Sequence, residues 1–534
     1  MYGTYRDSTL IQKRLASLEM VDNPSPGIAA MLGAFVLLLI LGSTHANADA
    51  REESWDGRIH APEGQGIDST RLLPIFDVLE EKQVPIHGLL VVRNGHIVLE
   101  AIFPPFDGES AHDVASCTKS VTATILGMAI DRGLLDSVDQ SFVAALKNRA
   151  CGNLNAAKKS LRIEDLLTMR AGWASLDDGL TLMQMFQSPN WSQFAMDLPI
   201  IQTPGQHHQY RSINSHLLSA VIHERTGMSL AEFGTKELFD PLGIRDVGWP
   251  SDPQGITHGW GDMRIKPRDL ARIGQLYANR GVWNGKSILS ERWIQAAWTP
   301  RARTRSSHYP LYGYHWWLGP GRFAAVGRGG QRLLVVPEEN LVVVVTAGAN
   351  GDQELILDQV LNHHLMKAIV AKNAIPPNPA AEAALRERCR AERKTTLPSL
   401  PLAHSPLARR ISGVLYELKA NPYIQNLRLD FVDASEARLQ LHFAPLLRLP
   451  AIDIAIGLDG VTRRSAGRYG LPVECKGTWV NESTFEFELD EVGNINRWLV
   501  TLIYKDGFAE VMIRSKTGLP DLARRATPAL PTHE

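Results

Sequence analysis

A helix with almost no polar face lies in the first half of this chain. Residues 115–133 read ASCTKSVTATILGMAIDRG, and within them residues 121–130 are small or apolar almost all round. A surface helix carries its apolar residues on one stripe, whereas a helix that is apolar on every side must be surrounded by other elements. The chain is therefore expected to build a domain around this helix.

Ser116 and Lys119 lie at the start of the same stretch. Their spacing of three residues puts both side chains on one helix face. A serine hydroxyl attacks a carbonyl poorly unless a base takes its proton, and a partly desolvated lysine amine can act as that base. A serine at the first helical turn also directs its backbone N–H, with the helix dipole, at a developing oxyanion.

A lone S-x-x-K motif often occurs by chance, and a lysine is usually a solvated surface residue. In this chain no other serine has a lysine three positions later. A lysine at the start of a buried helix needs a reason, so the pair is interpreted as a nucleophile and its base.

Length and composition narrow the classes of protein that fit. A chain of 534 residues exceeds the usual size of one domain, so two domains are expected. The hydrophobic fraction is 44%, the charged fraction 21% and the net charge −1. These values are ordinary for a globular protein, and the chain has no basic tract interleaved with aromatics. Nucleic acid is therefore not expected as a partner.

The N-terminal region resembles a targeting segment. Residues 28–41 form an apolar run of about 14 residues, which is short for a membrane span. Lys13 and Arg14 precede the run, and Ala46-Asn47-Ala48 follows it. This order predicts that residues 1–48 are a signal peptide cleaved after Ala48, or an uncleaved anchor that would be the only contact with a membrane. The protein is accordingly expected to be periplasmic or secreted.

The cysteines carry little information. Cys117, Cys151, Cys389 and Cys475 show no metal-binding spacing and no dense framework. Cys117, next to Ser116, is interpreted as a small buried packing residue. No disulfide and no metal site are predicted.

Periodicity predicts the remaining elements of a first domain over residues 53–373. An Asn94-Gly95 turn joins two apolar runs within residues 88–103, which indicates an antiparallel hairpin. Three short apolar runs in residues 323–346 are expected to complete the sheet. Helices are expected over residues 69–83, 161–173, 214–225, 266–280 and 353–372. The fold class is α+β, with an antiparallel sheet and a helical cluster.

The C-terminal part of the chain has a different pattern. Residues 374–410 are rich in proline, alanine and charge, and they are interpreted as a linker with a short helix near residues 380–394. In residues 411–534, short runs alternate polar and apolar residues between turns. This pattern predicts a small all-β domain, either a barrel or a sandwich. Its role is not assigned.

Three separated motifs carry a family resemblance. They are Ser116-x-x-Lys119, Tyr210-x-Ser212-x-Asn214 and the run of residues 327–331, GRGGQ. In this order they resemble the β-lactamase-related serine hydrolases, most closely the class C-like branch. That branch includes penicillin-binding-protein-like proteins, esterases, D-amino-acid peptidases and 6-aminohexanoate-dimer hydrolases. The resemblance runs over about residues 86–371, with supporting phrases such as EDLLTMRAG and KPRDLARIGQLYANRG.

The resemblance implies a β-lactamase/transpeptidase-like fold and roles for the residues that match. Ser116 would be the acylated nucleophile, Lys119 its proton acceptor, and Tyr210 the phenol that passes the proton to the leaving group. Backbone N–H groups would form the oxyanion hole, and Ser212, Asn214, Arg328 and Gly329 would contact substrate. The oxyanion donors would be those of Ser116 and of Gly330 or Gln331. The implied protein is an enzyme that cleaves a small ester or amide and needs no cofactor.

Two departures from the family pattern bear on the substrate. Ser212 stands where the family often has asparagine, and Arg328-Gly329-Gly330 replaces the usual lysine or histidine, hydroxyl residue and glycine. Both changes favour an esterase or amidase over an antibiotic-cleaving enzyme. A D-amino-acid peptidase, a β-lactamase, and a penicillin-binding or sensor-type homologue with little turnover remain the alternatives.

Two other motifs are set aside. Residues 516–518, KTG, spell the family's third motif but fall within the C-terminal β domain, where they are interpreted as the exit of a strand. The adjacent pairs His207-His208 and His363-His364 lack an acidic partner at ligand spacing, so metal binding is not expected there.

Overall fold

The computed structural model describes residues 55–146, 149, 151–174, 179–390, 406–418, 421, 424–445, 449–519 and 521–529. All the described residues belong to one compact unit, Glu53–Glu534. The predicted signal or anchor segment, residues 1–48, lies outside the described residues, as do residues 391–405 of the predicted linker. Within the described residues, no helix is both long and apolar enough to cross a membrane.

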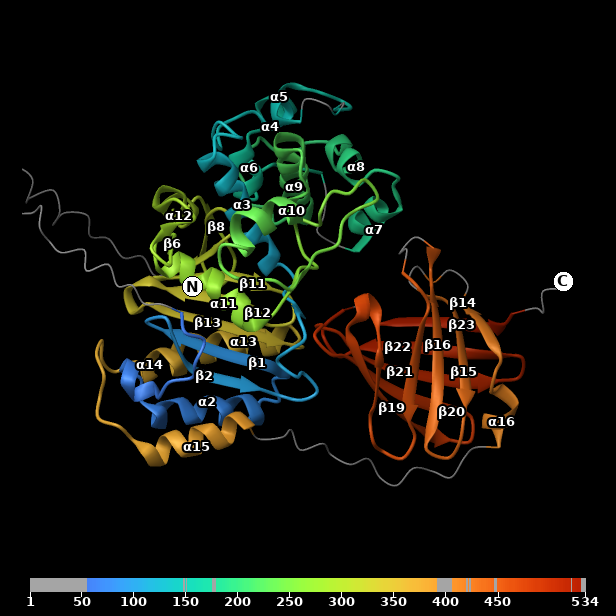
Figure 1. The fold of residues 1–534 in the computed structure, drawn as a ribbon. Helices are drawn as coiled ribbons and strands as arrows, with labels where there is room; N and C mark the ends of the chain where they lie inside the picture. The colour runs from blue at the N-terminus through green and yellow to red at the C-terminus, as the bar shows by residue number, and fades with distance from the viewer. Residues whose placement is uncertain are drawn as a thin grey trace, which may run out of the picture. The chain divides into compact units, whose positions relative to one another are not determined.

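An antiparallel sheet forms the centre of the first domain (Figure 1). Its strand order in the described chain is β2-β1-β13-β12-β11-β10-β9-β8. The predicted hairpin is present, because Arg93 pairs with His96 across the Asn94-Gly95 turn. The three strands expected near the end of the domain are also confirmed. The strands are β1 (Ile86–Arg93), β2 (His96–Ile102), β8 (Ala302–Arg303), β9 (Leu311–Tyr312), β10 (Trp317–Gly319), β11 (Arg322–Gly327), β12 (Gln331–Val336) and β13 (Leu341–Ala347).

Helices cover both faces of this sheet (Figure 1). Side chains of a strand alternate between faces, so Leu89 and Val91 pack in one core and Leu90 and Val92 in the other. The first core is covered by α2 (Ser69–Glu81), α13 (Gly351–Gln359), η4 (Val360–Leu365), α14 (Met366–Ala368) and α15 (Pro379–Arg390). The second is covered by α3 (Cys117–Asp131), α9 (Ser212–Thr226) and α11 (Pro267–Ala278).

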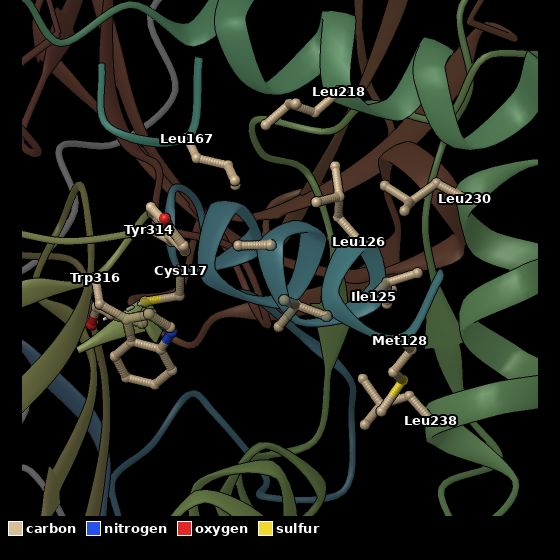
Figure 2. Packing of buried hydrophobic residues seen from close by; sticks show 14 of the residues in the cluster. Cys117, Ile125, Leu126, Met128, Leu167, Leu218, Leu230, Leu238, Tyr314 and Trp316 are labelled. Carbon is tan, nitrogen blue, oxygen red and sulfur yellow. Dashed lines mark hydrogen bonds between the residues drawn. The ribbon is translucent and has the colours of Figure 1, made fainter. Parts of the chain in front are cut away.

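Helix α3 is as enclosed as its sequence predicts. Every residue from Cys117 to Ala129 is buried. Figure 2 shows side chains such as Leu167, Leu218, Leu230 and Trp316 gathered around it. Contact on all sides is what a helix without a polar face requires.

Short elements surround α3 and complete the helical cluster. The predicted helix over residues 161–173 is too long, because α6 ends at Leu167 and Met169 takes a left-handed φ of 58°. The helices are α4 (Phe142–Ala145), α5 (Ala156–Ser160), α6 (Ile163–Leu167), α7 (Gly179–Gln187), α8 (Trp191–Asp197), α10 (Leu230–Gly234), η2 (Thr235–Phe239) and α12 (Glu291–Ala297). Short strands are β3 (His112–Asp113), β4 (Val247–Gly248), β5 (Arg264–Ile265), β6 (Val282–Trp283) and β7 (Lys286–Ser287), and short 3-10 turns are η1 (Pro62–Gln65) and η3 (Pro337–Glu339).

The predicted short helix near residues 380–394 is α15, and it packs on α2. Leu385 belongs to the same core as Leu72 and Ile75, and Arg388 pairs with Asp77 of α2 at 2.8 Å. The first part of the proline-rich segment is therefore anchored to the first domain.

The C-terminal domain is a barrel rather than a sandwich. Its described strands follow the order β17-β16-β15-β14-β23-β22-β21-β20-β19-β18, and Gly457 of β17 pairs with Lys476 of β19, which closes the sheet. Inward residues alternate with outward ones, as in β20, where Phe485 and Phe487 are buried. The elements are α16 (Leu407–Ile411), β14 (Leu415–Leu418), β15 (Ile424–Phe431), β16 (Glu436–Phe443), β17 (Ile452–Gly457), β18 (Arg463–Ala466), η6 (Arg468–Gly470), β19 (Pro472–Asn481), β20 (Thr484–Glu491), β21 (Arg497–Lys505), β22 (Phe508–Ser515) and β23 (Leu522–Pro528).

Candidate active site

Ser116 and Lys119 meet at the N-terminus of α3. Ser116 is the residue immediately before the helix, and Lys119 lies one turn further on. The Lys119 Nζ donates a hydrogen bond to Ser116 Oγ at 2.8 Å and another to the carbonyl oxygen of Trp260 at 2.9 Å. The lysine is only 1% exposed, so its amine is held in a fixed position against the serine.

The surroundings of Lys119 contain a neutral imidazole. Burial, with a further contribution from the Lys119 charge, lowers the pKa of His315 to about 3. His315 Nε2 lies 2.9 Å from Ser215 Oγ, and its carbonyl oxygen accepts a hydrogen bond from Ser120 Oγ at 2.6 Å. His315 therefore acts as a structural link between α3 and α9 and adds no positive charge beside Lys119.

Tyr210 lies beside the same amine. It precedes α9, and its ring centroid is 4.9 Å from Lys119 Nζ. Trp317 and Tyr312 pack against the phenol ring, with centroid separations of 5.8 Å and 6.3 Å. This packing restrains the ring and leaves Tyr210 on the wall of the pocket that contains Ser116.

A pocket of about 420 Å³ opens over Ser116. It lies in the size range of small-molecule sites, about 300–1,000 Å³. The pocket brings together Ser116, Tyr210 and Arg328, which are far apart in the sequence. It is lined by Asp113, Ala115, Ser116, Tyr210, Trp260, Gly261, Asp262, Trp317, Val326, Arg328 and Ile495.

Two carboxyl groups on the pocket wall were not singled out from the sequence as site residues. Burial, and then the charge of Asp262, raises the pKa of Asp113 to about 7, although its Oδ1 accepts a hydrogen bond from the Ala115 N–H at 2.7 Å. Burial also acts to raise the pKa of Asp262, but a hydrogen bond from His258 at 2.8 Å and nearby arginines outweigh it and hold this pKa low. Of these two carboxyl groups, Asp262 is therefore ionised near neutral pH, whereas Asp113 gains or loses its proton in that range.

Arg328 faces the pocket and contacts the barrel. Its guanidinium donates to Asn496 Oδ1 at 3.0 Å, and a second nitrogen lies 3.5 Å from the carbonyl oxygen of Thr517. Thr517 belongs to the KTG run, which follows β22 directly, as expected for a strand exit. Ile495, next to Asn496, lines the pocket itself. The barrel thus supplies one wall of the pocket, which the sequence pattern did not indicate.

The turn between β11 and β12 places the predicted glycines. Gly329 has a φ of 82°, and its N–H donates to Glu354 Oε1 at 2.8 Å. Gly330 faces Ala347, Ala349 and Leu357, and the Gln331 side chain bonds the backbone of Ala347. Among the described pocket-lining residues neither Gly330 nor Gln331 appears, whereas Val326 of β11 does.

Ser212 and Asn214 occupy the first turn of α9. Asn214 is fully buried; it accepts a hydrogen bond from Trp173 Nε1 at 2.8 Å and donates to Met169 Sδ at 3.3 Å. Ser212 is 6% exposed. Of the described residues that line the pocket, Tyr210 is the only one from this motif. Through these two hydrogen bonds, Asn214 links α9 to the segment after α6.

One group of described residues could hold a metal ion, but it lies elsewhere. The ligand atoms of Asp56, His60 and His96 are within 4.8 Å of one another. His96 begins β2, and the other two residues lie in the segment before η1. None of the three is among the described residues that line the pocket over Ser116.

Comparisons with known proteins find a related hydrolase. The chain is 24% identical over 300 residues to the 6-aminohexanoate-dimer hydrolase of Paenarthrobacter ureafaciens, an alignment that covers 52% of this chain and 75% of the relative.

Two solved structures are also similar. A putative 6-aminohexanoate-dimer hydrolase from Bacillus anthracis aligns over 62% of this chain and 86% of its own, with 18% identity and a TM-score of 0.45. The octameric penicillin-binding protein homologue from Pyrococcus abyssi aligns over 86% of this chain and 99% of its own, with 18% identity and a TM-score of 0.43.

A family profile gives the assignment. The profile described as Beta-lactamase matches residues 75–364, which is more than half of the chain. That range contains Ser116, Lys119, Tyr210 and Arg328 together with the sheet and helices that position them. The chain therefore belongs to the Beta-lactamase family and is a β-lactamase-related serine hydrolase.

Proposed function

We propose that this protein cleaves a small ester or amide through an acyl-enzyme on Ser116. The observation that carries the proposal is the 2.8 Å hydrogen bond between Lys119 Nζ and Ser116 Oγ on a buried helix. A nucleophile within hydrogen-bond reach of a base, with the base fixed by a further contact, is the arrangement that covalent catalysis requires. Here the further contact is the Trp260 carbonyl.

The proposed reaction has two halves. In the first, Lys119, once it has lost its own proton, takes the Ser116 proton while Oγ bonds to the substrate carbonyl carbon. The tetrahedral intermediate collapses, the bond to the leaving alcohol or amine breaks, and Tyr210 relays the proton to that leaving group. In the second half, water attacks the acyl carbon while Lys119 and Tyr210 accept its proton. The bond between the acyl carbon and Ser116 Oγ then breaks, Oγ regains a proton from these groups, and the acid product leaves.

The developing oxyanion needs backbone donors. The Ser116 N–H lies at the positive end of α3, which suits this role. For the second donor the prediction was Gly330 or Gln331. Since β11 lines the pocket through Val326, we propose that a β11 N–H supplies it instead.

The pocket charges suggest a substrate with charged ends. Arg328 can bind a carboxylate through parallel hydrogen bonds, and Asp262 can bind an ammonium group. The relative in Paenarthrobacter ureafaciens is named for a dimer of 6-aminohexanoate, a molecule with both groups. We propose short amides or esters that carry a carboxylate, an ammonium group, or both.

Export belongs to the proposal as well. The basic, apolar and A-x-A order of residues 1–48 supports secretion or transfer to the periplasm. N-terminal mass spectrometry of the protein from cell fractions tests this part. A mature start near Asp49 supports cleavage, whereas retention of residues 28–41 indicates an anchor.

A substrate panel tests the chemistry. The purified protein and Ser116→Ala are compared on p-nitrophenyl esters of increasing chain length, on the 6-aminohexanoate dimer, on D-amino-acid amides and on a chromogenic cephalosporin. Turnover of any ester or amide by the parent protein, lost in the variant, supports the proposal. One burst of product equal to the enzyme concentration, without turnover, supports the penicillin-binding or sensor-type alternative. No release and no burst would contradict both.

A further inference from the structure

The C-terminal barrel encloses a second cavity, of about 320 Å³, in its interior. Inward residues of many strands line it, among them Leu439 of β16, Ile454 of β17, Phe487 of β20, Val500 of β21 and Val511 of β22. Each of these side chains is at most 8% exposed. The cavity lies at the lower end of the size range for small-molecule sites. Small barrels are either filled by side chains or hold one small ligand, and this barrel leaves space.

The lining is apolar except for one cluster of polar groups. Arg468 donates to both oxygens of Glu491, at 2.9 Å and 2.7 Å, and Asn496 Nδ2 donates to Glu491 at 3.2 Å. Arg468 lies between β18 and β19, whereas Glu491 and Asn496 flank the turn between β20 and β21. The polar groups therefore gather at one end of the barrel.

The charges in this cluster cancel. Arg468 and Glu491 form a bidentate ion pair, which satisfies the guanidinium and the carboxylate with each other. Burying an additional ionised head group beside such a pair would leave that new charge without a partner, which is costly. The cluster can still exchange hydrogen bonds with an uncharged polar group, such as a hydroxyl or a carbonyl.

We propose that the barrel interior is a binding site for a slender aliphatic chain with an uncharged polar end. The apolar walls of this cavity favour an apolar molecule over water, because water there would lack hydrogen-bond partners except at the polar end. The aliphatic chain would pack between the side chains from β16, β17, β20, β21 and β22, and its polar end would lie toward Arg468, Glu491 and Asn496.

The site is distinct from the pocket over Ser116, although the two approach each other. Asn496 lines the cavity and accepts the hydrogen bond from Arg328, and the preceding residue, Ile495, lines the hydrolase pocket. Binding in the barrel is measurable whether or not the protein hydrolyses anything, so its test is independent of the proposed function.

Binding is measured with an uncharged fluorescent probe, N-phenyl-1-naphthylamine, in the Ser116→Ala background. The probe is then displaced with 1-butanol, 1-decanol and decanoate. We expect saturable binding, displacement by 1-decanol at a concentration at least tenfold lower than by 1-butanol, and weaker displacement by decanoate at pH 8. Absence of saturable binding would overturn the proposal, and preferred displacement by the ionised decanoate would overturn its choice of an uncharged end.

Two substitutions on one strand locate the site. Val511→Trp fills the cavity, whereas Met512→Trp adds the same ring on the outer face of β22, where Met512 is 37% exposed. The first should weaken probe binding at least tenfold and the second should leave it within twofold. Equal affinities in the two variants would overturn the proposal.

A measurement without a barrel variant covers the case in which Val511→Trp fails to fold. The full chain is photolabelled with an aliphatic diazirine alcohol and mapped by peptide mass spectrometry, with and without prior block of Ser116 by a fluorophosphonate. Labels on β16, β17 and β20–β22 that persist after the block support the barrel site. Labels confined to the hydrolase pocket, or lost after the block, would refute it.

Discussion

Lys119 Nζ and Ser116 Oγ are joined by a 2.8 Å hydrogen bond at the start of a helix whose first thirteen residues are all buried. The depth of the helix explains why the pair is well positioned. A lysine on a surface helix would populate many rotamers. The buried Lys119 side chain is held by the packing around it, and its amine is held by the hydrogen bond to the Trp260 carbonyl. This fixed amine is the basis of the predictions that follow.

Lys119→Met should lower kcat by about 100- to 10,000-fold, the usual contribution of a general base. Methionine keeps an unbranched side chain of similar length in the buried site but cannot accept a proton. Lys119→Arg should be similarly inactive, because arginine does not give up its proton. Lys158→Met is the matched control, since Lys158 is also 1% exposed but donates to the carbonyls of Gly152 and Met196, away from the pocket. A Lys119→Met enzyme with the kcat of the Lys158→Met enzyme would refute the role.

Gly329→Ala should destabilise the protein by about 1–3 kcal/mol, because its φ of 82° strains any other residue. Its new Cβ would also lie 2.1 Å from Cγ2 of Ile495. Ile495→Ala should therefore recover part of this loss in a double-mutant cycle followed by urea unfolding.

Gly330→Ala is the control for this cycle. Its φ is 89°, but its new Cβ would face Ala347, Ala349 and Leu357. Ile495→Ala should not offset its cost. If Ile495→Ala offsets the destabilisation of both glycine variants equally, or of neither, then Ile495 does not pack tightly against Gly329 in the β11–β12 turn.

Arg328→Ala should raise KM about tenfold or more for substrates with a free carboxylate and change KM little for neutral esters, because it removes a charge-assisted hydrogen bond. Asn496→Ala removes the group that Arg328 contacts in the barrel but leaves the guanidinium in place. It should therefore preserve the preference for carboxylates. If the two variants have the same effect on both substrate classes, Arg328 serves the contact with the barrel and not substrate recognition.

Asp113→Asn should make the protein relatively more stable as the pH rises from about 4 to about 7. The folded-state pKa of Asp113 is raised to about 7, so the folded chain binds the proton more tightly than the unfolded chain does. The stability that this group contributes is present at low pH and is lost as the pH rises through that window. Asparagine cannot lose a proton and keeps the hydrogen bond from Ala115.

Urea unfolding at a series of pH values measures this difference. Asp506→Asn, in an exposed turn of the barrel, is the control, and its stability curve should run parallel to that of the parent. A parallel curve for Asp113→Asn as well would show that Asp113 is ionised like a surface carboxylate.

Local patterns predicted the elements whose signals lie within a few residues. The sequence predicted the hairpin at Asn94-Gly95, the three strands β11–β13 and the helix α11 that packs on the sheet. All of these elements are present in the structure. No helix was expected between residues 173 and 214, yet α7 and α8 lie there. These helices have only 9 and 7 residues, so each offers few turns over which a helical period can be recognised.

The pocket could be predicted only in part, because much of it depends on long-range packing. The spacing from Ser116 to Lys119 is local to one helix, and it brought the two side chains together as expected. Asn214 shares the Tyr210 motif, but the turn into α9 directs it toward Trp173, and spacing alone does not reveal that direction. Ile495 comes from another domain, and no local pattern in the barrel connects it with the pocket.

The most direct test of the account is peptide mapping of the protein after reaction with a fluorophosphonate probe. The account predicts one modified residue, Ser116, with labelling abolished in Ser116→Ala and slowed strongly in Lys119→Met, while both variants keep the parent's circular dichroism. Nucleophile removal in a comparable hydrolase costs about a million-fold in turnover, so residual labelling at this site should not be detectable. Modification of another residue at the parent rate in Ser116→Ala would contradict the account.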